Sequence, residues 1–100
     1  MRLSVVSDES VVPRELLPLP APYVAPRTET ERRLAEIWRN ALGMDRVGVE
    51  DSYNDLGGDS FLASVIFEQI RAAFGVALPM GTLVEAPTIA ALAERIDDLR

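Results

Sequence analysis

A serine at the end of an acidic, glycine-containing stretch is the residue of this chain best suited to chemistry. Residues 55–60 read Asp-Leu-Gly-Gly-Asp-Ser, and an apolar run follows without proline or glycine until Gly75. This pattern predicts that Ser60 lies where a loop becomes a helix. The paired glycines have no Cβ, so the backbone there can be approached closely. The unpaired N–H groups of a helix start favour a phosphate ester at Ser60. The alternative is that Ser60 only caps the helix, an interaction that would stabilise the fold by about 1 kcal/mol.

Missing residue types exclude the catalytic units that depend on histidine or cysteine. The chain contains no histidine and no cysteine. A Ser-His-Asp or Cys-His catalytic unit, a disulfide and a structural zinc site are therefore excluded within it. A calcium loop of the EF-hand type fails as well, because Tyr53 and Leu62 stand where oxygen ligands are required. We expect no catalytic residue and no metal ligand.

Length and composition indicate one small globular domain. The chain has 100 residues, of which 48% are hydrophobic and 26% charged. Its net charge of −6 disfavours nucleic acid and anionic membranes and favours partners with basic patches. No apolar run approaches the roughly 18 residues of a membrane span, and Asp8 and Glu9 interrupt any signal peptide. We expect a cytoplasmic monomer. Met1 favours a free-standing chain, but the sequence leaves open the alternative of a domain cut from a larger protein.

Three apolar periodicities predict three substantial helices. The first begins after Thr28, which has capping-box spacing to Glu31, and ends at Gly43. The second spans about Ser60–Phe74, and the third begins after Thr88. The expected core faces are Leu34, Ile37, Trp38, Ala41 and Leu42; Leu62, Ile66, Ile70 and Ala73; and Ile89, Leu92, Ala93 and Ile96, with Leu99 added if the last helix reaches the chain end.

The segments between these helices complete an all-α fold. One short helical turn is expected at Thr82–Glu85, within a segment too short to be helical on its own. Residues 44–59 form a long acidic loop, whose acids should stay outside. Its apolar residues, which should pin it to the bundle, are Val47, Val49, Tyr53 and Leu56. The prediction is a small four-helix bundle with three longer helices, one short helix and a long first loop.

Proline dominates the N-terminal quarter of the chain. Five of the seven prolines lie within residues 1–26, where no helical or strand period survives. We divide the chain into a linker or tail, residues 1–26, and a folded domain, residues 27–100. Apolar residues around Leu17–Pro20 leave two possibilities open: a flexible tail, or a segment that folds back on the helices or docks on a partner.

The motif and its surroundings resemble the peptidyl carrier (thiolation) domains of nonribosomal peptide synthetases, in the acyl carrier superfamily. The resemblance covers about three quarters of the chain, and its segments are Tyr23–Glu31, Asp51–Ala63, Ile70–Arg71, Phe74–Val76, Leu78–Pro79 and Leu83–Ala93. The paired glycines and the upstream segment favour this type over an acyl carrier of polyketide or fatty acid synthesis. An unmodified helical interaction domain is the alternative from another class.

The resemblance implies a carrier rather than an enzyme. A phosphopantetheinyl transferase would use coenzyme A and Mg²⁺ to attach 4′-phosphopantetheine to Ser60. The thiol would then carry an aminoacyl or peptidyl thioester between adenylation, condensation, epimerisation, tailoring or thioesterase domains. Gly57 and Gly58 would give access, and Asp59 would help the transferase dock or order its metal. Aspartate at this position is associated with carriers that serve epimerisation domains, and the Leu17–Pro20 connector docks on the adenylation domain in this family.

Apolar side chains beside the serine predict a partner surface. Only four polar residues follow Ser60 before the predicted helix ends, so some apolar side chains must face outward. Phe61 and Val65, four residues apart, form a stripe next to Ser60. The resemblance adds Met80 and Leu83 from the short helix. The alternative is that the second helix is buried on most sides.

Overall fold

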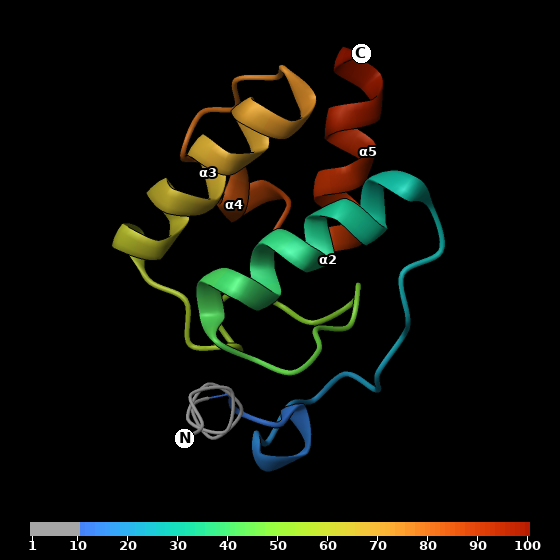
Figure 1. The fold of residues 1–100 in the computed structure, drawn as a ribbon, viewed down its shortest axis with the longest axis vertical. Coiled ribbons are helices and arrows are strands. Elements are labelled where there is room, and N and C mark those ends of the chain that lie inside the picture. Colours follow the sequence, from blue (N-terminus) through green and yellow to red (C-terminus); the bar gives the residue numbers. More distant parts are fainter. Residues whose placement is uncertain (1–10) are drawn as a thin grey trace, which may run out of the picture.

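Four α-helices and one 3₁₀ turn follow one another in the computed structural model, which describes residues 11–100 (Figure 1). The elements are the 3₁₀ turn η1 (Arg14–Leu16) and the helices α2 (Glu29–Leu42), α3 (Ser60–Phe74), α4 (Thr82–Glu85) and α5 (Ile89–Leu99). Within the described range no strand is present, apart from an isolated bridge between Val12 and Met44. The predicted all-α bundle is confirmed.

Side-chain caps and glycines set the helix ends where the sequence predicts them. Thr28 before α2 and Thr88 before α5 each accept a hydrogen bond from the backbone N–H three residues later, at 3.0 and 3.2 Å. Gly43 and Gly75, which follow α2 and α3, both have φ of 70°. This left-handed conformation ends a helix and is adopted most easily by glycine.

The core lies where α2 packs against both α3 and α5. The buried side chains of these three helices are Leu34, Ile37 and Trp38; Ala63, Ile66, Phe67, Ile70 and Phe74; and Ile89, Leu92, Ala93 and Ile96. The expected faces of α2 and α5 are largely confirmed. Leu99 remains 61% exposed although α5 reaches it, because α5 ends at the rim of the bundle (Figure 1).

The predicted core face of α3 is partly wrong. Ala73 is exposed and Leu62 only half-buried, whereas Phe67 and Phe74 lie in the core. The apolar residues of α3 fit two adjacent helical faces equally well, so periodicity does not choose between them. The face that contains the two large aromatic side chains removes more apolar area from water and therefore faces inward.

The long loop between α2 and α3 is pinned by its apolar residues, as predicted. Its buried side chains are Val47, Val49, Tyr53 and Leu56. Asp51 contradicts the expectation that the loop acids stay outside, because its side chain is 0% exposed. Its oxygens accept from Arg14 Nε at 2.7 Å, from Arg14 Nη2 at 2.6 Å and from the Gly48 N–H at 2.8 Å. A carboxylate tolerates burial when it is paired and hydrogen-bonded in this way.

Residues 11–26 lie against this loop. The backbones of Val12 and Gly43 are joined by a 2.8 Å hydrogen bond, and those of Val24 and Val49 by one of 2.9 Å. Of the two possibilities left open by the sequence, the structure shows the folded-back one for this segment. The rest of the predicted tail, residues 1–10, lies outside the described residues. The division of the chain after residue 26 stays a prediction.

Candidate functional site

Ser60 is the first residue of α3, and Asp59 before it is the cap. Asp59 Oδ1 accepts a hydrogen bond from the Leu62 N–H at 2.9 Å, and the Asp59 carbonyl accepts one from the Ala63 N–H at 2.9 Å. Ser60 is exposed. The alternative that Ser60 is the helix cap is therefore wrong. The cap interaction is made by Asp59, which leaves the Ser60 hydroxyl available at the surface.

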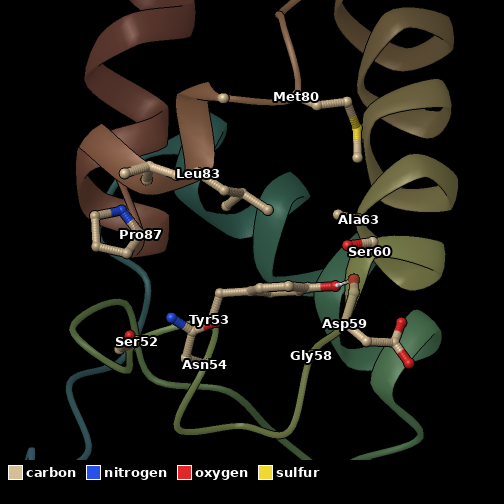
Figure 2. Close-up of a pocket in the computed structure, with 12 residues that line it drawn as sticks. Ser52, Tyr53, Asn54, Gly58, Asp59, Ser60, Ala63, Met80, Leu83 and Pro87 are labelled. Carbon is tan, nitrogen blue, oxygen red and sulfur yellow. Dashed lines mark hydrogen bonds between the residues drawn. The ribbon is translucent and has the colours of Figure 1, made fainter.

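Tyr53 supports the start of α3 from the loop side. Its hydroxyl donates to the Asp59 carbonyl at 2.7 Å, and Figure 2 shows the ring reaching across to the chain beside Ser60. Its ring meets Trp38 edge-on, with centroids 5.4 Å apart. Burial first, and the Asp59 carboxylate second, raise the pKa of Tyr53, so the phenol keeps its proton and stays a donor. The sequence predicted Tyr53 only as an apolar anchor of the loop.

The two paired glycines are needed for different structural reasons. Gly57 has φ of 85°, a left-handed conformation that other residues adopt at a cost of about 1 kcal/mol. Gly58 lies against the face of Tyr53, and a Cβ at this position would overlap the ring. Gly58 is therefore required for packing, whereas its predicted role in access to Ser60 stays a prediction.

A groove of about 570 Å³ opens beside Ser60, between the start of α3 and the segment that contains α4 (Figure 2). Ser60 and Ala63 of α3 line one side, and Met80 and Leu83 line the other. Asn54 of the loop also contributes to the lining. An exposed hydroxyl at the rim of a groove with apolar and polar walls fits a flexible group attached to it.

Comparison with known proteins identifies the family. The model of the family described as "Phosphopantetheine attachment site" matches residues 32–96. The chain is 37% identical to a solved active-site mutant of a peptidyl carrier protein, with a TM-score of 0.75, and covers 88% of that chain and 79% of its own. The chain belongs to the peptidyl carrier proteins of the phosphopantetheine attachment family. Its covalent group is 4′-phosphopantetheine.

Two further comparisons show the context in which such carrier domains occur. The chain is 37% identical to the carrier in a solved complex of the transferase Sfp with coenzyme A, with a TM-score of 0.74, and covers 99% of that chain and 76% of its own. It is 47% identical to part of gramicidin S synthase 2 of Brevibacillus brevis over 76 residues. This match takes 76% of the chain but spans only 2% of the synthase.

The predicted partner surface of the carrier domain is only partly exposed. Phe61 is 74% exposed and Met80 is exposed, as the prediction requires. Val65 and Leu83 are half-buried, and Leu83 lines the groove. Val84, which the sequence analysis did not single out, is 84% exposed. Successive helical residues point about 100° apart, so with Thr82 buried and Leu83 half-buried, Val84 falls on the outer side of α4.

Other site types find no support in the described range. Within residues 11–100 no cluster of three or more acidic side chains is arranged to hold a metal ion. Over the same range no helix combines the length and the apolar character that crossing a bilayer requires.

Proposed function

We propose that this chain is a peptidyl carrier that is phosphopantetheinylated on Ser60 and carries an aminoacyl or peptidyl thioester between the enzymes of a nonribosomal peptide synthetase. The observation that carries the proposal is the exposed Ser60 hydroxyl at the first position of α3, beside a groove. Backbone N–H groups of the first helical turn and the positive end of the helix dipole favour a phosphodiester there. When bound, the group supplies a thiol, which the chain lacks because it has no cysteine.

The proposed partners are a phosphopantetheinyl transferase and the domains of a synthetase rather than small-molecule substrates. The solved complex of Sfp with coenzyme A and a peptidyl carrier supports a transferase of this kind as the first partner. A structure that joins an adenylation protein to its carrier, 30% identical to this chain with a TM-score of 0.71, supports an adenylation domain as the next. Condensation, epimerisation, tailoring or thioesterase domains would then act on the thioester.

The chain itself is proposed to be a substrate and shuttle, not an enzyme. It has no histidine or cysteine to form a catalytic unit, and its exposed acids suit basic patches on partner enzymes. We propose that it acts in the cytoplasm, because transfer from coenzyme A requires access to that cofactor, and that it acts as a monomer. Its net charge of −6 disfavours binding to nucleic acid.

A thiol count tests the proposal. The chain has no cysteine, so the free-thiol count of the purified protein should be zero. Incubation with coenzyme A, Mg²⁺ and a broad-specificity phosphopantetheinyl transferase, followed by removal of small molecules, should raise the count to one per chain. A count that stays at zero, while a known carrier in a parallel reaction gains its thiol, would overturn the proposed function.

Replacing Phe61 with alanine should weaken partner binding without weakening the fold. Phe61 is 74% exposed, so the free energy of unfolding should change by no more than about 0.5 kcal/mol. Loss of an exposed aromatic contact beside Ser60 should raise the KM of the transferase for the carrier by about fivefold or more. Leu99→Ala, an exposed apolar residue at the rim of the bundle, is the matched control and should leave KM unchanged. Equal KM values for both variants would contradict the predicted surface.

A further inference from the structure

We propose that Tyr53 is a positioning residue for the modification of Ser60, acting through the hydrogen bond from its hydroxyl to the Asp59 carbonyl. The inference rests on the proposed function of Ser60. The two oxygens are 2.7 Å apart. The Asp59 carbonyl belongs to the peptide group whose nitrogen is that of Ser60, so the Tyr53 hydroxyl acts on the backbone of the residue to be modified.

Tyr53 is held in place by contacts other than its hydrogen bond to Asp59. Its backbone N–H donates to the Pro87 carbonyl at 2.8 Å, and its carbonyl accepts from the Gly58 N–H at 3.1 Å. Its side chain is almost fully buried, with one edge contact to Trp38 of α2. A donor fixed by packing can orient its acceptor, whereas a mobile donor would follow it.

The other hydrogen bonds of Asp59 do not provide this link. Asp59 Oδ1 and the Asp59 carbonyl accept from the N–H groups of Leu62 and Ala63, which both belong to α3. These bonds move with the helix end. The Tyr53 hydroxyl instead joins the start of α3 to the loop (Figure 2). Through the edge contact of its ring with Trp38, Tyr53 also joins this point to α2.

This link matters because of where Ser60 lies. Terminal helical turns fray more readily than helix interiors, and Ser60 is in the first turn and exposed. Phosphoryl transfer requires the attacking oxygen to be in line with the leaving group, so its rate depends on the orientation of the serine hydroxyl. Holding the Asp59–Ser60 peptide narrows the range of orientations that the hydroxyl adopts.

The test is Tyr53→Phe in the full chain, which keeps the ring and removes only the hydroxyl. With the chain as varied substrate of a phosphopantetheinyl transferase and coenzyme A, kcat should fall about fivefold, the effect of one lost hydrogen bond on the transition state. KM should stay unchanged, because Phe61 and Met80 are untouched. In the unmodified chain, the Ser60 amide resonance should shift, and hydrogen exchange should accelerate at the Ala63 amide, which donates to the same Asp59 carbonyl.

Thr30→Val is the matched control. Thr30 is buried, and its hydroxyl donates to Asp97 Oδ1 at 2.7 Å between α2 and α5. This variant also loses one buried hydroxyl and its hydrogen bond, but at the end of α2 that is remote from Ser60 (Figure 1). It should lower thermal stability by a similar amount as Tyr53→Phe, while kcat and the Ser60 amide resonance stay as in the parent.

Three results would overturn the inference while leaving the proposed function intact: a parental kcat for Tyr53→Phe, a rise in KM alone, or an equal fall in kcat for Thr30→Val. The last would show that general stability, not position, limits the reaction. If the folded parent chain accepts no phosphopantetheine at all, the proposed function fails and this inference with it.

Discussion

Replacing Arg14 with methionine is expected to lower the free energy of unfolding by about 3–5 kcal/mol, because it leaves the Asp51 carboxylate buried without its counter-ion. The Arg14 side chain is only 10% exposed and that of Asp51 is not exposed at all. Two hydrogen bonds, of 2.6 and 2.7 Å, join the two groups, and Arg14 Nη2 also donates to the Ala21 carbonyl at 2.9 Å. Urea unfolding followed by circular dichroism measures the loss.

A variant of an exposed ion pair is the control for this prediction. Arg32→Met removes an exposed arginine that pairs with Glu29 within α2 at 3.3 Å, and it should cost no more than about 0.5 kcal/mol. Adding Asp51→Asn to Arg14→Met should recover part of the loss, because asparagine can still accept from the Gly48 N–H without bearing a charge. A loss for Arg14→Met as small as that for Arg32→Met would contradict the buried pair.

Replacing Gly58 with alanine is expected to cost about 1–3 kcal/mol and to slow the modification of Ser60. The new Cβ would overlap the ring of Tyr53. That ring is fixed by burial and by its edge contact with Trp38, so the loop must shift instead. Such a shift would strain the hydrogen bond from Tyr53 to Asp59. Unfolding midpoints and the rate of phosphopantetheine transfer check the two effects.

Gly81 provides the matched control for this substitution. It borders the same groove, but its φ is −64° and no atom lies within 4 Å of the position that its Cβ would occupy. Gly81→Ala should therefore leave stability unchanged or raise it by up to about 1 kcal/mol. Equal effects of Gly58→Ala and Gly81→Ala would refute the packing role of Gly58.

Local chemistry made much of the fold predictable from the sequence. The helix starts and ends were predictable from Thr28, Thr88, Gly43 and Gly75. A hydroxyl cap and a left-handed glycine each depend only on backbone groups a few residues away. The faces of the first and last helices followed from apolar spacing, since each of these helices has a polar side that must face water. Such features need no knowledge of distant segments.

Features that depend on distant or competing residues were not predictable. Arg14 and Asp51 are 37 positions apart, and nothing in the proline-rich segment indicates that Arg14 enters a buried pair. Asp59 and Ser60 are adjacent and both make good caps, so only the backbone shows that the aspartate takes this role. The bond from Tyr53 to the Asp59 carbonyl likewise requires the loop to close on the helix start.

The central claim is that Ser60 carries the phosphopantetheine, and intact mass spectrometry tests it most directly. The parent chain, Ser60→Ala and Ser64→Ala are each incubated with coenzyme A, Mg²⁺ and a phosphopantetheinyl transferase. Ser64 is an exposed serine one turn further along α3, so its replacement controls for a general effect of losing a hydroxyl there. The parent and Ser64→Ala should gain the mass of one phosphopantetheine, and Ser60→Ala should gain none. An adduct on folded Ser60→Ala would contradict the account.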